Sequence, residues 1–157
     1  MMTQRLTDFL DSRNVRYEKL THTTSYTAQG TAQAAHIPVK ELAKTVMVKM
    51  DGKMVMVVLP ASYRVDLELF KQATGVKKVE LALESEFKQL FPECEIGAMP
   101  PFGNLYDMEV FCSPQLVKDE EIAFNAGSHT ELIRISYKDF VDLVSPTVVR
   151  LSTGDHK

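Results

Sequence analysis

The chain of 157 residues has no tryptophan and only two cysteines, Cys94 and Cys112. Neither belongs to a CxxC pair or has a histidine at metal-ligand spacing, so we expect neither a disulfide framework nor a zinc site. No run approaches the roughly 18 apolar residues of a membrane span, and the N-terminal segment has charges and no apolar signal core. The sequence therefore favours a protein of the reducing cytoplasm that does not contact a membrane.

Excess positive charge is also absent, since the net charge is −3 and the pI is about 5.8. A broad basic face, typical of general DNA-binding proteins, is not expected, and any contact with nucleic acid must be local. The middle of the chain is the richest in cations: Lys44, Lys49, Lys53, Arg64, Lys71, Lys77 and Lys78. Such a cluster is most often a solvated face, so it predicts no partner by itself.

The motifs of many enzyme classes are missing as well. The sequence contains no GxGxxG, GxxxxGK[ST], HExxH or GxSxG pattern, and no cysteine–histidine arrangement typical of nucleophilic catalysis. We therefore expect neither an organic cofactor nor a metal.

Strand-like and helix-like patterns alternate along the chain. The clearest signal is a hairpin, with β-rich runs at Lys44–Met50 and Lys53–Leu59 around an Asp51-Gly52 turn of type I′. Apolar spacing and capping residues predict helices over 3–13 (with Thr3 as N-cap), 26–36, 66–75 (closed by Gly75), 85–91 (capped by Ser85) and 137–143. Further strands are predicted at 15–20, 78–81, 108–112, 122–124 and 131–135.

Length and an apolar content of 45% fit one compact domain. The element order predicts an α/β fold of α+β type, in which one mixed, mostly antiparallel sheet curls into a barrel-like shape with helices around it. We assign residues 1–148 to this domain and 149–157 to a polar tail, and the final LSTGDHK segment is expected to be frayed.

Lys44 stands at the start of a strand on its apolar side. Alternation places it on the same face as Val46, Val48 and Met50, so it points inward if this is the core face. Burial of an ammonium group is costly. Lys44 must therefore reach the rim as a snorkelling side chain, pair with an anion or line a cleft.

Two loops are also candidates for function. The segment GAMPPFG (97–103) contains two prolines and two glycines, which can make a tight structural turn or present backbone N–H groups to an oxyanion. The segment 125–130 reads as a turn of small residues that carries His129. Ser128 is adjacent to His129 and so is not expected to form a catalytic pair with it, and His22, His36 and His156 are isolated.

Taken together and in this order, these features resemble the YbaK/aminoacyl-tRNA deacylase family, which also occurs as the editing insertion of bacterial prolyl-tRNA synthetases. The resemblance covers nearly the whole chain. It depends on the segments HTTSYTA (22–28), AKTV (43–46), LP (59–60), RVDL (64–67), GAMPP (97–101) and FNAGSH (124–129). Together the segments are specific, although each alone is weak.

The resemblance implies hydrolysis of the ester between an amino acid and the terminal ribose of a tRNA, usually tRNA for proline carrying the wrong, small amino acid. The acceptor end of an aminoacyl-tRNA is then the substrate, and a prolyl-tRNA synthetase is a candidate partner. The residues implied for catalysis are Lys44, Gly97, Ala98 and Met99, and those implied for substrate binding are His22, Tyr26, Pro100, Pro101, Phe102, Gly127, Ser128 and His129.

In this interpretation Lys44 holds the 3′-terminal nucleotide, and N–H groups near Gly97 polarise the ester carbonyl. Two alternatives stay open. The chain can be a non-catalytic relative that binds a nucleotide, an aminoacyl-tRNA or a synthetase in the same cleft, or a hydrolase of another small ester or amide.

Overall fold

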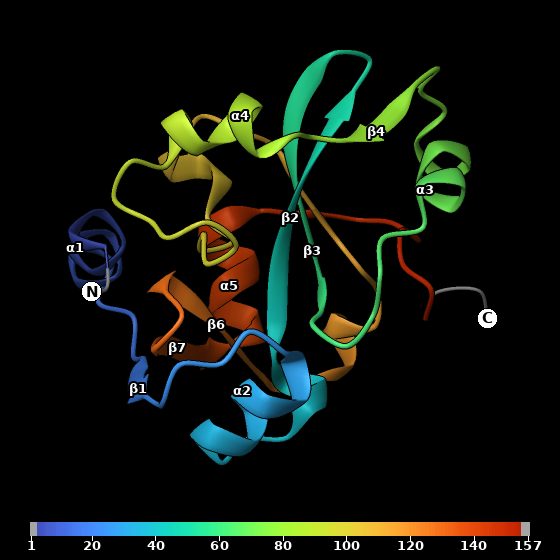
Figure 1. The fold of residues 1–157 in the computed structure, drawn as a ribbon. Helices are drawn as coiled ribbons and strands as arrows, with labels where there is room; N and C mark the ends of the chain where they lie inside the picture. The colour runs from blue at the N-terminus through green and yellow to red at the C-terminus, as the bar shows by residue number, and fades with distance from the viewer. Residues whose placement is uncertain (1–2, 155–157) are drawn as a thin grey trace.

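A computed structural model describes residues 3–154 of the chain. Two sheets and five α-helices form the fold (Figure 1). One sheet has the strand order β1-β7-β6 and the other β4-β2-β3-β5-β8. The strands are β1 (Glu18–Thr21), β2 (Ala43–Met50), β3 (Lys53–Pro60), β4 (Val79–Leu81), β5 (Val110–Cys112), β6 (Glu121–Ser128), β7 (Glu131–Ser136) and β8 (Thr147–Val148).

The predicted hairpin is confirmed as β2 and β3. These strands pair in antiparallel register from Ala43–Pro60 to Met50–Lys53. Asp51 and Gly52 connect them with φ angles of 48° and 85°, and the two positive values are those that a type I′ turn requires. The hairpin runs through the centre of the molecule and carries Lys44 near its open end (Figure 1).

The α/β class is confirmed, but the single curled sheet is wrong, because the strands form two separate sheets. All pairings of the smaller sheet are antiparallel, whereas β3–β5 and β5–β8 in the larger sheet are parallel. Side chains of both sheets share the larger core cluster, but among residues 3–154 the backbone pairing between them is limited to an isolated bridge between Leu42, just before β2, and Ala123 of β6. Beyond it, β4 occupies the edge of β2 from Val48 to Met50, so β6 cannot continue along β2 and close a barrel.

Apolar side chains cover both faces of the larger sheet. Met47, Met56 and Val58 belong to the larger core cluster, and Val48 and Val57 belong to a second cluster on the opposite face. The expectation of one core face was therefore incomplete. Lys44 shares the face of the second cluster and lies opposite Leu59, a buried member of that cluster.

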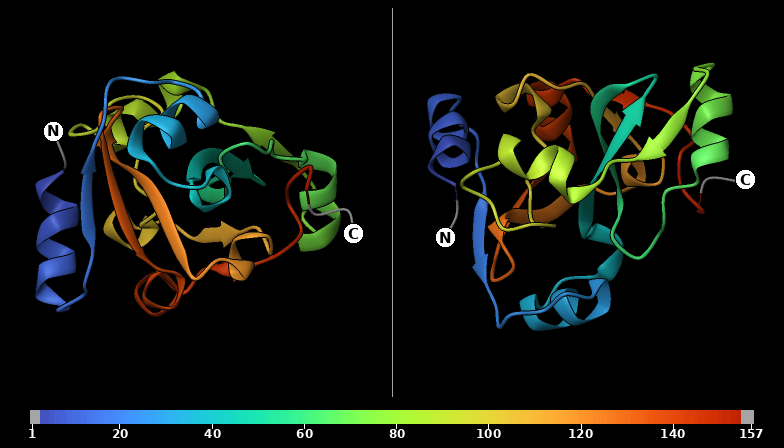
Figure 2. Two further views of the ribbon diagram at one scale, coloured as in Figure 1. Left: turned by 90° about the horizontal axis from the view of Figure 1, so that it is seen from below. Right: turned by 45° about the horizontal axis from the view of Figure 1, so that its top comes forward.

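The helices are α1 (Gln4–Ser12), α2 (Ala28–Ala35), α3 (Leu67–Thr74), α4 (Glu84–Phe87) and α5 (Tyr137–Val144). The predicted cap Thr3 is confirmed, because its hydroxyl accepts the N–H of Leu6, and Gly75 ends α3 in the left-handed conformation. The predicted cap Ser85 is wrong. The carboxylate of Glu86 instead accepts the N–H of Leu83, which starts α4 at Glu84. Helices α1 and α3 lie at opposite ends of the molecule (Figure 1 and Figure 2).

Two expectations near the C-terminus need correction. The predicted turn at 125–130 is shorter, because β6 continues to Ser128 through a register shift, with Gly127 at a φ of 106°. The tail is not frayed over its described part. Leu151 and Ser152 are fully buried, and Ser152 bridges to Val65, because this segment covers the second core cluster. His156 lies outside the described residues.

Within residues 3–154, no helix is long and apolar enough to span a membrane. Cys94 is partly buried and Cys112 is buried.

Candidate functional site

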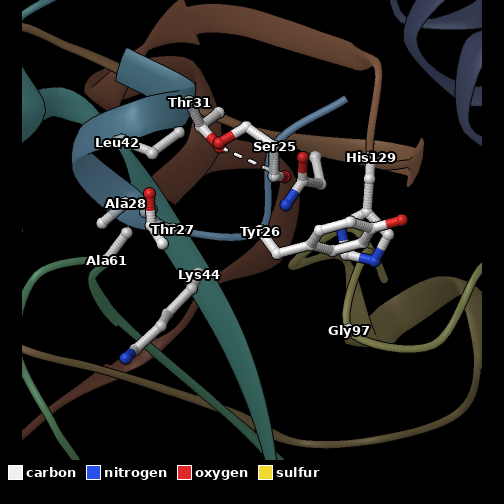
Figure 3. Close-up of a pocket in the computed structure, with 12 residues that line it drawn as sticks. Ser25, Tyr26, Thr27, Ala28, Thr31, Leu42, Lys44, Ala61, Gly97 and His129 are labelled. Carbon is white, nitrogen blue, oxygen red and sulfur yellow. Dashed lines mark hydrogen bonds between the residues drawn. The ribbon is translucent and has the colours of Figure 1, made fainter. Parts of the chain in front are cut away.

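A pocket of about 170 Å³ opens where four segments meet: the start of α2, the start of β2, the loop at Gly97 and the β6–β7 turn (Figure 3). Its lining comes from segments far apart in the sequence. The lining residues are Ser25, Tyr26, Thr27, Ala28, Thr31, Leu42, Ala43, Lys44, Ala61, Gly97, Asn125 and His129.

Hydroxyl groups dominate the wall at the start of α2. The Thr27 hydroxyl caps the helix by accepting the N–H of Gly30, and the Thr31 hydroxyl donates to the carbonyl of Ser25 at 3.5 Å (Figure 3). A Cβ atom at Gly30 would lie 2.6 Å from Ser25 Oγ and 2.7 Å from Thr27 Oγ1, closer than such contacts allow. Gly30 thus lets these side chains pack against the helix.

The opposite wall is fixed by hydrogen bonds between the Gly97 loop and β6. Glu95 N–H donates to the carbonyl of Gly127, and Gly127 N–H donates to the carbonyl of Ala98. His129 N–H donates to the Glu95 carboxylate at 3.2 Å. Gly97 is held between these bonds with a φ of 85°, which favours glycine.

His129 has a defined tautomer when neutral. Its Nε2 lies 2.8 Å from the carbonyl oxygen of Ile96, which can only accept, so Nε2 carries the proton. Nδ1 is then left as an acceptor. The ring of Tyr26 lies 4.7 Å from the His129 ring, centroid to centroid, and covers it at the pocket mouth (Figure 3). Tyr26 itself is 77% exposed, so much of its side chain is in contact with solvent.

Lys44 is half-buried at the other side of the pocket, and no carboxylate pairs with it among residues 3–154. Burial lowers the pKa of Lys44, and the nearby Arg64 guanidinium lowers it further. Both causes disfavour the ammonium form. An anion in the pocket would offset them.

No carboxylate and no thiol lines the pocket. The described residues also contain no group of three or more His, Cys, Asp or Glu side chains placed to hold a metal. The groups that the pocket offers to a ligand are therefore one ammonium, hydroxyls, an amide, an imidazole and the backbone at Gly97.

The structure brings four of the predicted site residues together at this pocket: Tyr26, Lys44, Gly97 and His129. The other residues implied by the resemblance do not line it: His22, Ala98, Met99, Pro100, Pro101, Phe102, Gly127 and Ser128. Seven of these eight residues are buried, and five of the seven belong to the 97–103 loop itself. The N–H of Ala98 donates to the carbonyl of Glu95, so it is not free to face a ligand.

His22 supports the pocket indirectly. Its backbone N–H donates to the carbonyl of Thr130 in the β6–β7 turn, and its Nδ1 donates to the carbonyl of Thr23. This connects the segment that precedes α2 to the turn that carries His129.

Sequence reasoning missed several lining residues. Thr27 and Ala28 lie in the HTTSYTA segment that carries the resemblance, and Asn125 lies in the FNAGSH segment, so these positions had a signal. Ala43 likewise lies in the AKTV segment. Thr31, Leu42 and Ala61 had no signal, because single apolar or small residues in a helix or near a strand end give no pattern that distinguishes a pocket from a core.

Residues 22–143 match the model of the aminoacyl-tRNA editing domain family. The match spans most of the chain and includes every residue that lines the pocket. The chain therefore belongs to this family of aminoacyl-tRNA editing deacylases, as the resemblance implied.

Individual relatives agree with this assignment. The chain is 25% identical over 151 residues to the multifunctional Ser/Thr-tRNA deacylase ProXp-y of Escherichia coli strain K12, covering 93% of this chain and 90% of the relative. It is 32% identical over 75 residues to the proline–tRNA ligase of Bacillus mycoides, a match that covers 48% of this chain but 13% of the ligase.

Solved structures show the same fold. A crystal structure of a hypothetical protein superposes with a TM-score of 0.84 at 20% identity and covers 95% of this chain and 99% of that one. A candidate trans-editing enzyme for prolyl-tRNA synthetase superposes with a TM-score of 0.81 at 22% identity and covers 96% of both chains.

Proposed function

We propose that this protein is a trans-editing deacylase that hydrolyses the ester of a mischarged tRNA, with tRNA for proline carrying a small amino acid as its substrate. The observation that carries the proposal is the pocket itself. Lys44, which pairs with no carboxylate among residues 3–154, and a backbone loop with positive φ at Gly97 line the same small cavity, in a chain of the editing-domain family.

The size and lining of the pocket support a small aminoacyl group. Ala28, Ala43, Ala61 and Gly97 contribute almost no side-chain volume, and the cavity measures about 170 Å³. Ser25, Thr27 and Thr31 add hydroxyl oxygens that can meet a polar side chain. A hydroxyl-bearing amino acid is thus a fitting substrate, and serine and threonine are the amino acids named for the Escherichia coli relative.

The chemistry needs no nucleophile from the protein. A water molecule attacks the ester carbonyl, the carbonyl oxygen takes up the negative charge, and the terminal ribose hydroxyl leaves with a proton. An aminoacyl ester is already activated, so positioning and stabilisation of the oxyanion provide most of the rate. Gly97 N–H is the candidate oxyanion donor, since the N–H of Ala98 is already bonded to Glu95.

Lys44 holds the terminal nucleotide in this mechanism. An ammonium group that burial and Arg64 destabilise gains most from a phosphate or a ribose oxygen beside it. No metal or cofactor has a role. The enzyme would act in the cytoplasm, where charged tRNA is present, alone or beside a prolyl-tRNA synthetase.

A panel of charged tRNAs tests the proposal. The purified protein is incubated with tRNA for proline charged with alanine, cysteine, serine or proline, and with tRNAs charged with serine or threonine, while ester loss is followed. We expect loss of one or more small amino acids and retention of proline.

A non-catalytic binding module is the second candidate, because no side chain lining the pocket is a carboxylate or a thiol. In that case no ester in the panel is hydrolysed, although a charged tRNA still binds. Cleavage of simple amino acid esters with no preference for tRNA would instead indicate a general esterase.

A further inference from the structure

A groove continues from the pocket on the far side of Lys44. It measures about 300 Å³ and is lined by Thr27, Ala28, Gln29, Lys44, Ala61, Ser62, Tyr63 and Arg64. Thr27, Ala28, Lys44 and Ala61 line both spaces, so the pocket and this Lys44–Arg64 groove are continuous. The Lys44 side chain runs away from Tyr26, Gly97 and His129 and ends on the side of Ala61 (Figure 3).

The Lys44–Arg64 groove is positively charged and has no internal counter-ion. None of its lining residues is acidic, and the first turn of α2, which forms one wall, contains no acidic residue. Among residues 3–154, neither Lys44 nor Arg64 forms an ion pair. Other cations of the chain do: Lys53 lies 2.6 Å from Glu109 and Arg134 lies 2.7 Å from Glu41.

The backbone of Arg64 is fixed although its side chain is exposed. Its N–H donates to the Thr153 hydroxyl at 3.2 Å, and its carbonyl accepts the N–H of Thr153 at 2.9 Å. The adjacent Val65 bridges to the buried Ser152. The base of the Arg64 side chain is thus held at the groove, while the guanidinium remains free to meet a ligand.

Two cations in one groove repel each other. Burial is the main cause that lowers the pKa of Lys44, and the repulsion from Arg64 lowers this pKa further. A half-buried ammonium beside a second cation lowers the stability of the folded protein. A ligand with negative charge removes the cost, and a phosphate accepts hydrogen bonds from both an ammonium and a guanidinium.

We infer that the Lys44–Arg64 groove binds the phosphodiester backbone of the substrate's 3′-terminal strand, and that Arg64 is a phosphate-binding residue. The inference rests on the proposed function, since the aminoacyl group must occupy the adjoining pocket. The strand then leaves the pocket past Lys44 and runs between α2 and the segment 61–64. This gives an acidic protein a short, local contact with the tRNA acceptor end.

The test compares Arg64→Gln with wild-type protein on two substrates that carry the same amino acid: a charged tRNA and the aminoacyl ester of adenosine, which has no phosphate. Arg13→Gln is the matched control, since Arg13 is exposed at the end of α1 and lies over the ring of Phe9. Deacylation rates are measured under single-turnover conditions over a range of protein concentrations. A thermal melt of each protein shows whether it is folded.

We expect Arg64→Gln to need roughly ten-fold more protein for half-maximal rate on the charged tRNA, because one charge-assisted contact is lost. The maximal rate should be retained. The dependence of log affinity on log salt should become shallower by about 0.7, the value for one phosphate of a single strand. On aminoacyl-adenosine, Arg64→Gln should equal wild type, and Arg13→Gln should equal wild type on both substrates.

An unchanged half-maximal concentration and salt slope in Arg64→Gln, with wild type active, would overturn the inference and leave the proposed function standing. If wild type hydrolyses neither substrate, the proposed function fails. The groove is then tested by fluorescence anisotropy with an uncharged oligonucleotide that ends in CCA. Weaker binding by Arg64→Gln than by Arg13→Gln supports the phosphate site, and equal binding refutes it.

Discussion

Two lysines on strand β2 differ in their surroundings. Lys49 lies 2.5 Å from Glu86 and 3.5 Å from Glu80, and the hydrogen bond that Lys49 donates to Glu86 is the largest cause of a raised pKa for Lys49. Lys44 faces no carboxylate in the described part of the chain, and burial and Arg64 lower its pKa. Five positions separate them, so they project to opposite faces of the sheet.

This difference distinguishes the two ends of β2: the end with Lys49 has a structural role, and the end with Lys44 is open to a ligand. At the closed end, β4 and α4 supply the counter-ions that Lys49 needs. At the open end, Lys44 meets small residues, a hydroxyl-rich wall and a second cation. We propose that the partner of this half-buried cation is the substrate.

The largest effect is expected from Gly97→Val, across the pocket from Lys44. Gly97 has a φ of 85°, and its Cβ position lies 3.5 Å from His129 Cε1, so a branched side chain would strain the loop and press on His129. Loss of an oxyanion donor costs about 10²–10³ in rate. Single-turnover deacylation should fall by at least this factor, while Tm changes modestly.

Met99→Leu is the control for this variant, because Met99 is buried behind the loop and a volume-conserving change should be mild. If the Gly97→Val protein keeps its deacylation rate, or loses it only because the protein unfolds, the loop has a structural role and not a catalytic one.

Lys44→Met should separate activity from stability. The rate on charged tRNA should fall by about 10², as expected when one member of a desolvated charge pair is removed. Tm should not decrease at neutral pH, because the variant removes a desolvated ammonium and its repulsion with Arg64. Deacylation assays and thermal melts check the two parts, and near-native activity in a folded variant would refute the role of Lys44.

Lys49→Met should show the opposite pattern. Its ion pairs lie at the surface, where such pairs contribute little, so Tm should decrease by less than about 3 °C. Deacylation should stay within two-fold of wild type, to be measured in the same assay. Loss of activity as large as that of Lys44→Met would remove the distinction between the two ends of β2.

The smallest effect is expected from a metal chelator. The proposed mechanism uses only water, the backbone at Gly97 and the Lys44 ammonium, so EDTA should leave the rate unchanged. Loss of activity that added zinc restores would contradict this mechanism.

Local structure was largely predictable from the sequence. Capping residues and glycines fix helix ends through neighbouring atoms, so Thr3 and Gly75 were read correctly. The division into two sheets was not predictable, because it depends on pairing between distant segments, such as β1 with β7 and β3 with β5. The burial of Leu151 likewise depends on a cluster assembled from distant residues.

The site was predictable only in part. Residues with distinctive side-chain chemistry, such as Lys44 and His129, or with an unusual backbone conformation, such as Gly97, could be identified. The structure brings these three residues to one pocket. Arg64 was named among several cations and in the RVDL segment of the resemblance, but neither gave it a role. Its position beside Lys44 arises from the path of the chain after β3, which no local pattern encodes.

The most direct test of the central claim is the pKa of Lys44, measured by NMR on the side-chain Nζ in the free protein and with an oligonucleotide ending in CCA. Because phosphate binds the ammonium form, the pKa of Lys44 should lie below its ordinary value in the free protein and rise on binding. The pKa of Lys49, the internal control, should lie above its ordinary value in both states. A Lys44 pKa that does not change when the oligonucleotide binds would contradict the account.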